Sequence, residues 1–148
     1  MYSKYYILFP KLSILWALEE FDICIKLIFK AMSKNIDDYI VRSNQNAWNL
    51  LVEKGVNYEG IFVKSLRFDK EKQRSSTILL KFEAGASYPY HNHPAGEELF
   101  VIGGSCIIEG TKLVSGDYLF TPPNYKHSVK TETGCLLMFI VPEEVEIL

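Results

Sequence analysis

The chain has 148 residues, 48% of them apolar and 14% aromatic, which is the composition of a folded domain rather than a disordered segment. Its formal net charge of -2 and its lack of a basic cluster exclude a nucleic-acid partner, because phosphate binding needs a basic face. The three cysteines form no CxxC pair, which indicates reduced thiols and a cytoplasmic protein. Cys106 and Cys135 lie in apolar runs, so we expect them to be small buried residues.

The first 31 residues predict an amphipathic helix that extends the domain at its N-terminus. Charged side chains recur at spacings of three and four along one face: Glu19, Asp22, Lys26 and Lys30. Apolar residues fill much of the opposite face, and the acids cut this run short of the roughly 20 residues that a membrane-spanning helix needs. Two interpretations stay open. The helix packs on the body or on a second subunit, or residues 1–31 are not native and the protein starts at Met32.

Beyond residue 45 the pattern changes to short strands separated by glycine-containing turns. This divides the chain into a helical extension, 1–45, and a β-domain, 46–148. β-Branched and aromatic residues predict strands over 60–68, 76–82, 99–102, 105–108, 118–120 and 136–141. The polar stretch 69–74 is expected to form a hairpin turn between the first two strands. Many short strands with close-spaced turns predict an all-β fold, a small antiparallel barrel or sandwich.

All three histidines of the chain lie in two short segments. His91 and His93 are one residue apart, so on a strand their side chains point to the same face. Simple alternation places Glu97 in phase with His93, whereas a one-residue bulge would bring Glu98 inward instead. His127 comes from a separate element that follows a rigid Pro-Pro turn.

This pattern predicts a metal site whose ligands are His91, His93, Glu97 and His127. Three imidazole nitrogens and one carboxylate oxygen suit one divalent ion, with zinc or iron first and manganese, nickel or copper as further choices. Ligating histidines donate their second N–H to an acceptor, so we expect nearby polar side chains to surround the ligands: Tyr88, Tyr90, Glu98 and Tyr125. Glu97 and Tyr90 are the residues expected to act in catalysis.

The two segments resemble the paired motifs of the cupin superfamily. The first motif is glycine, five residues, His-x-His, three or four residues, glutamate, six residues and glycine. The residues that fit it without a gap are Gly85, His91, His93, Glu97 and Gly104. In the second motif Gly116, Pro122 and His127 match, while Asn124 stands in place of the usual glycine and Thr131 in place of the usual asparagine. Asparagine tolerates the left-handed backbone conformation better than most residues, so we expect this turn to persist.

Within the superfamily, the sequences around His93 and His127 look like the ChrR type, a zinc-binding cupin domain named after a bacterial anti-sigma factor. The resemblance covers residues 48–141. It implies a cupin jelly roll in which the first acid of the pair, Glu97, is a ligand. The anti-sigma activity of that factor belongs to a separate N-terminal domain with a His/Cys zinc motif. This chain has no histidine before His91, so we do not expect a sigma-binding role.

The resemblance implies a metal-binding protein, and the leading interpretation is a dioxygenase-type enzyme that acts on a small organic substrate. The alternatives are a non-catalytic, zinc-binding sensor or regulatory module and, as a third, a sugar-type isomerase or epimerase. That third chemistry usually needs basic residues in the pocket, and only Lys126 lies near the motifs. We also expect a small-molecule ligand, no membrane partner, and a homodimer paired through the aromatic-rich segment 58–68.

Overall fold

The computed structural model describes residues 23–26 and 35–148, and the chain divides into two compact units, 1–40 and 41–148. In the first unit, residues 23–26 form a helical turn and Ile36–Tyr39 forms a 3-10 helix, η1. The Asn35 side chain caps η1 by accepting a hydrogen bond from the Asp37 N–H at 3.1 Å. The helix expected over residues 1–31 lies mostly outside the described residues. In the part of the chain that is described, no helix is long and apolar enough to cross a membrane.

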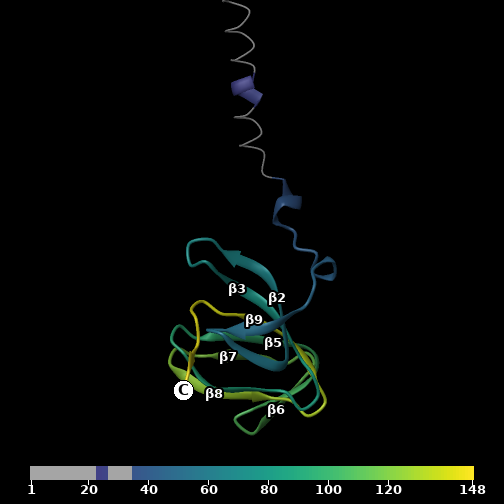
Figure 1. Ribbon diagram of the computed structural model, residues 1–148, viewed down its shortest axis with the longest axis vertical. Helices are drawn as coiled ribbons and strands as arrows, with labels where there is room; N and C mark the ends of the chain where they lie inside the picture. Colours follow the sequence, from purple (N-terminus) through teal and green to yellow (C-terminus); the bar gives the residue numbers. More distant parts are fainter. Residues whose placement is uncertain (1–22, 27–34) are drawn as a thin grey trace, which may run out of the picture. The chain divides into compact units, whose positions relative to one another are not determined.

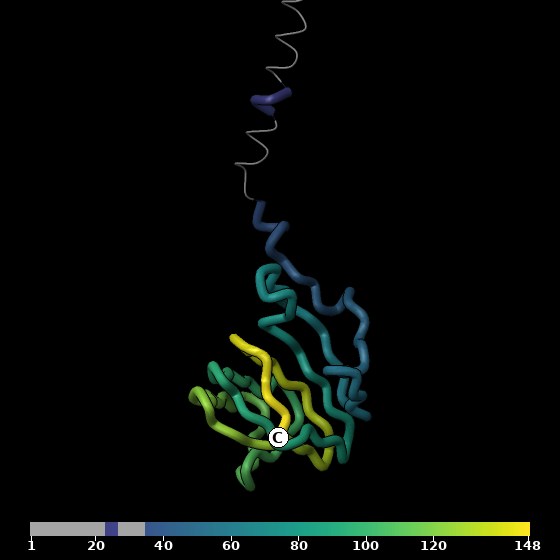
Figure 2. Tube along the Cα trace, turned by 60° about the vertical axis from the view of Figure 1, so that its left-hand side comes forward, coloured from purple at the N-terminus to yellow at the C-terminus, as the bar shows by residue number. Residues whose placement is uncertain are grey.

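The second unit is built almost entirely from antiparallel strands. After a 3-10 helix, η2 (Ser43–Gln45), the strands are β1 (Asn49–Glu53), β2 (Val56–Asp69), β3 (Arg74–Phe82), β4 (Ser87–His93), β5 (Glu97–Ile108), β6 (Thr111–Val114), β7 (Tyr118–Thr121), β8 (Tyr125–Lys130), β9 (Cys135–Ile140) and β10 (Glu146–Ile147). Their order in the sheet is β1-β2-β3-β9-β5-β8-β4-β10, with β6 and β7 paired to β5. Figures 1 and 2 show the sheet curling round on itself. The all-β antiparallel jelly roll expected from the sequence is confirmed.

The hairpin expected at residues 69–74 is also confirmed. β2 and β3 pair antiparallel, with Asp69 opposite Arg74 at the end of the ladder. The Asp69 carboxylate accepts hydrogen bonds from the Glu71 N–H at 2.9 Å and the Lys72 N–H at 3.1 Å. A side chain that bonds the backbone two and three residues ahead closes such a turn, which is why the polar stretch forms one.

The two strands expected on either side of Gly103 form instead one strand, β5. The register of β5 against β9 shifts between Val101 and Gly103, and a bulge of this kind bends a strand without ending it. The first part of β5 pairs with β7 and β9, and its last part pairs with β6 and β8. β5 therefore belongs to both sides of the barrel and carries Glu97 at its start.

Gly104, just after this bulge, is a position where a side chain would be both strained and obstructed. Its φ is +72°, and a Cβ there would lie 2.2 Å from the Gly134 carbonyl oxygen. We expect Gly104→Ala to lower the free energy of unfolding by about 3 kcal/mol, because both the backbone strain and the overlap must be relieved. Gly103→Ala is the matched control, since its Cβ would meet no atom within 4 Å. Urea denaturation of the two variants measures the difference, and equal losses would contradict this reading of the bulge.

The core lies inside the curled sheet and comes from alternate positions of its strands. Leu99 of β5 pairs with Phe139 of β9, and Val101 pairs with Leu137, and all four side chains are buried. Cys106 and Cys135 are buried free thiols, as expected.

Among the described residues of the segment 58–68, only the second half is left without a partner strand on one side. β1 pairs with its first half, where Leu51 lies opposite Tyr58 and Asn49 opposite Val63, and β3 covers its other side. The short strand β1 was not expected, because its five residues carry too little pattern to be recognised. The homodimer stays a prediction.

Candidate metal centre

The fold brings the three histidines together, although His93 and His127 are 34 residues apart. β4 and β8 pair antiparallel, with His91 directly opposite His127. The centroids of the three imidazole rings lie 4.5–4.8 Å apart, and all three side chains are buried. The common face expected for His91 and His93 is thus the interior face of the barrel.

The ring nitrogens of these histidines have the spacing of metal ligands. One nitrogen from each ring lies within 4.8 Å of the other two, and His93 Nε2 is 3.1 Å from His127 Nε2. Two nitrogens that each bind one ion at about 2.1 Å would lie about 3 Å apart. The distance between the two Nε2 atoms therefore matches a shared ion.

His91 is oriented by a hydrogen bond to the backbone. Its Nδ1 lies 2.7 Å from the Pro89 carbonyl oxygen. Because a carbonyl only accepts, Nδ1 carries the hydrogen and the lone pair is on Nε2. Ligating histidines are commonly fixed in this way, so His91 is prepared to bind through Nε2. The acceptor is a backbone oxygen, whereas the sequence had pointed to side chains.

Glu97 supplies an oxygen beside these nitrogens. It is the first residue of β5, and its side chain is 5% exposed. One carboxylate oxygen lies 3.6 Å from His93 Nδ1, and the other lies 3.8 Å from His127 Nε2. Glu98 is exposed, and its carboxylate accepts a hydrogen bond from the Tyr118 hydroxyl at 3.1 Å. Of the two acids, the structure brings Glu97 to the histidines and leaves Glu98 outside.

Burial changes the protonation of all four side chains. Desolvation lowers the pKa of His91, and desolvation together with the neighbouring imidazoles lowers the pKa of His93 to about 3 and that of His127 to about 4. Desolvation raises the pKa of Glu97 to about 8. The imidazoles are therefore neutral at pH 7 and able to bind a metal, while the buried Glu97 carboxyl is mostly protonated at that pH unless a cation binds it.

One unpaired carboxylate oxygen, that of Glu97, points to the same chemistry. Among the described residues, three buried atoms of this cluster have no hydrogen-bond partner: His93 Nδ1, His127 Nδ1 and Glu97 Oε1. A buried polar atom without a partner costs about 1–3 kcal/mol. An ion held by the imidazoles and the carboxylate would bind the Glu97 oxygen and balance its charge, so the donor set fits a divalent metal.

The tyrosines near these residues take different places. Tyr88 is buried, its ring packs edge-on against His91 at 4.8 Å, and its hydroxyl donates a hydrogen bond to Glu53. Desolvation and that hydrogen bond raise the pKa of Tyr88. Tyr90, expected to act in catalysis, is 47% exposed, because it alternates with His91 along β4. The structure does not bring Tyr90 to the ligands. Tyr125 is exposed as well.

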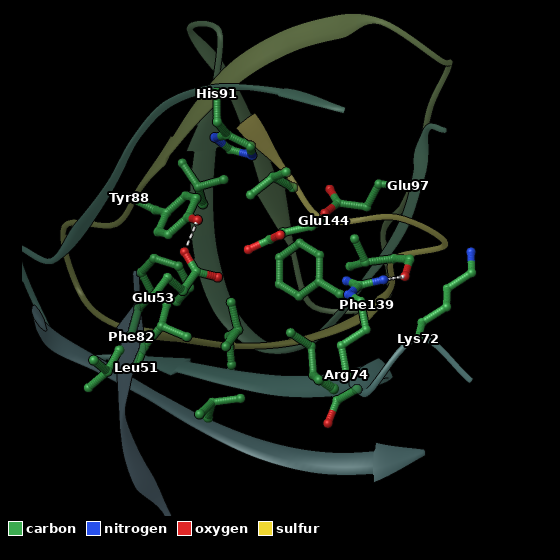
Figure 3. Close-up of a pocket in the computed structure, with 18 of the residues that line it drawn as sticks. Leu51, Glu53, Lys72, Arg74, Phe82, Tyr88, His91, Glu97, Phe139 and Glu144 are labelled. Carbon is green, nitrogen blue, oxygen red and sulfur yellow. Dashed lines mark hydrogen bonds between the residues drawn. The ribbon is translucent and has the colours of Figure 1, made fainter. Parts of the chain in front are cut away.

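A cavity of about 450 Å³ opens beside the cluster, and His91, Glu97, Tyr88 and Glu53 line it (Figure 3). Most of its wall is apolar: Val63, Ile78, Leu80, Phe82, Val129 and Phe139. Sequence reasoning missed Glu53, because it lies on β1, outside both motifs, and carries no recognisable pattern. It also missed the charged residues of this cavity that come from the hairpin turn and β3, Lys72 and Arg74.

The two departures from the second motif are accommodated by the fold. Asn124 has a φ of +64°, so it adopts the left-handed conformation as expected, and its N–H donates to the His93 carbonyl oxygen at 2.7 Å. The Thr131 hydroxyl donates to the Ser105 carbonyl oxygen at 2.7 Å and accepts a hydrogen bond from the Gly134 N–H at 2.9 Å. Asn124 thus links the turn before β8 to the end of β4, and Thr131 links the end of β8 to β5 and to the turn before β9.

Comparison with known proteins gives the family. Residues 37–142 match the family described as the ChrR Cupin-like domain. DNA damage-repair/toleration protein DRT102 of Arabidopsis thaliana is 37% identical over 65 residues, which are 40% of this chain and 21% of that protein. Dimethylsulfoniopropionate lyase DddQ of Ruegeria pomeroyi is 38% identical over 53 residues, which are 32% of this chain and 26% of that protein. The matched region is about a quarter of the length of these relatives.

Solved structures share the fold at low sequence identity. The polyketide cyclase RemF from Streptomyces resistomycificus superposes with a TM-score of 0.61 at 18% identity, covering 74% of this chain and 84% of that one. An acetylacetone dioxygenase from Acinetobacter johnsonii gives a TM-score of 0.58 at 18% identity and covers 74% of each chain. These likenesses show the fold alone. With the family match over most of its length, the chain belongs to the ChrR-type cupin family.

Proposed function

We propose that the protein is a metal-dependent enzyme that acts on a small organic molecule, and that its reaction is of the dioxygenase type. The observation that carries this proposal is the position of the histidine cluster. His91 and Glu97 line a solvent-accessible cavity whose remaining wall combines apolar side chains with polar and charged ones. A concave site in which apolar side chains surround convergent polar groups is typical of small-molecule binding.

A divalent metal bound by His91, His93, Glu97 and His127 would supply a Lewis acid that polarises a substrate oxygen. The protein's own residues would hold and orient the substrate. The apolar wall excludes water from the reacting groups. The Glu97 carboxylate, once released from the ion, would act as the base that takes up a substrate proton. The hydroxyl of Tyr88, fixed by its hydrogen bond to Glu53, lies on the same cavity wall.

The comparisons support an enzyme. An acetylacetone dioxygenase and a polyketide cyclase share this fold, and a dimethylsulfoniopropionate lyase is a sequence relative. All three names denote enzymes whose substrates are small organic compounds. A second candidate is a zinc-binding module without catalysis, because three imidazoles and one carboxylate can close around zinc at four ligands.

Metal analysis and oxygen consumption separate the two candidates. The protein is purified without added metal, its metal content is measured, and oxygen uptake is recorded with a panel of β-diketones and phenols. We expect bound iron and oxygen uptake with at least one compound, and neither in the His93→Ala variant. Stoichiometric zinc with no oxygen uptake across the panel would favour the non-catalytic module.

A further inference from the structure

A cation without a carboxylate partner lines the proposed substrate cavity. Arg74, the first residue of β3, is partly buried and lines the cavity together with His91 and Glu97 (Figure 3). Its Nη1 donates to the Val141 carbonyl oxygen at 2.8 Å, which fixes the side chain. A guanidinium has five N–H donors, so this bond leaves others for a ligand.

The acids of the same cavity are engaged elsewhere. Glu53 accepts the hydrogen bond from Tyr88, and Glu144 is exposed and lies 3.8 Å from a surface lysine. Glu97 faces the histidines. Within residues 35–148, no ion pair at or below 4.0 Å involves Arg74. A partly buried charge without a counterion is costly, and an anionic ligand would offset that cost.

A second cation lies at this end of the cavity, where the acidic residues Glu143 and Glu144 also gather. Lys72 also lines it, and its Nζ donates to the Pro142 carbonyl oxygen at 2.8 Å. The carbonyl groups of Val141 and Pro142 hold the two cations in place but carry no net charge. A neutral ligand would therefore leave the partly buried Arg74 charge without a counterion, whereas water solvates the exposed Lys72.

We infer that the cavity binds a small organic acid, with its carboxylate on Arg74 and its apolar body against Val63, Ile78 and Phe139. This inference rests on the proposed function, in which the cavity is the substrate site. The planar guanidinium suits a carboxylate because it can donate two parallel hydrogen bonds. The apolar side chains of this cavity then select acids that carry a hydrocarbon body rather than sugars.

Calorimetric titration of the metal-loaded protein with hydrocinnamate, and separately with its neutral amide, tests the inference. The acid should bind at least about tenfold more tightly than the amide, since hydrogen bonds to a charged partner are the stronger kind. Arg74→Gln should remove this preference, and Arg74→Lys should keep part of it. Lys112→Gln is the matched control, because Lys112 is an exposed cation on β6 that does not line the cavity.

Three results would overturn the inference. They are equal affinity of the acid and the amide for the wild-type protein, no binding of the acid at millimolar concentration, and a preference that survives in Arg74→Gln. The last result is expected if the carboxylate binds the metal instead. Metal content, measured in the same samples, keeps the two proposals apart, because Arg74→Gln should retain the metal that His93→Ala loses.

Discussion

Replacing Glu97 by glutamine is expected to stabilise the metal-free protein by about 4 kcal/mol at pH 8. Burial raises the pKa of this carboxyl group from 4.5 to about 8 in the folded protein, while the unfolded chain keeps the ordinary value. The stability that the protonated group contributes is fully present below pH 4.5 and is lost as the pH rises through 8. The loss is about 1.4 kcal/mol for each pH unit between the two values. Glutamine has no proton to release, so the variant does not lose this stability as the pH rises.

Urea denaturation of chelator-treated wild type and Glu97→Gln, at pH 5 and at pH 8, measures this effect. The two proteins should differ little at pH 5 and strongly at pH 8. The histidines titrate in both proteins alike, so the difference reports on Glu97. Glu98→Gln is the matched control and should change neither value, because Glu98 is exposed. A Glu97→Gln variant no more stable than wild type at pH 8 would contradict the buried, ionisable position of Glu97.

When metal is present, the same substitution is expected to be unfavourable. A bound cation favours the charged carboxylate, so glutamine should weaken metal binding at least about tenfold, which is measured by competition with a chromogenic chelator. A buried acid with a purely structural role would show the gain in stability without this loss. A gain in metal-free stability together with a loss of metal affinity would therefore identify Glu97 as a ligand.

The histidine pattern could be predicted from the sequence because it depends on local geometry. His91 and His93 share a face on any strand, and alternation alone favours Glu97 over Glu98. The left-handed turn at Asn124 followed from the tolerance of asparagine for positive φ. Such features need only neighbouring residues and a regular backbone.

The rest of the site depends on contacts between distant segments. Glu53 and Arg74 line the same cavity as His91 only because the sheet curls and brings β1, β3 and β4 around it. Neither residue belongs to a recognisable motif. An isolated charged residue is usually solvated, so nothing in the sequence was a reason to place either one in a cavity. The continuity of β5 through two glycines was missed for a related reason, because the bulge is stabilised by pairing with β9, which the local sequence does not reveal.

Replacing His93 by alanine should abolish metal binding. His93 Nε2 lies 3.1 Å from His127 Nε2, and His93 is 1% exposed, so the truncated site loses a buried ligand. A metal present at about a thousand times its Kd stabilises a folded protein by about 4 kcal/mol, which the variant would no longer gain. Because the truncation also leaves a cavity, the variant should be less stable even without metal.

The response to added metal separates these two losses. Thermal melts of wild type and His93→Ala, each with and without zinc or iron, should show a rise in Tm for the wild type alone, and elemental analysis should find metal only there. Tyr90→Ala is the matched control, since Tyr90 is exposed on the same strand and should leave both metal content and the metal-dependent rise unchanged. Full metal content in His93→Ala would remove this histidine from the ligand set. Because all three histidines of the chain belong to that set, such a result could not be explained by a substitute histidine elsewhere.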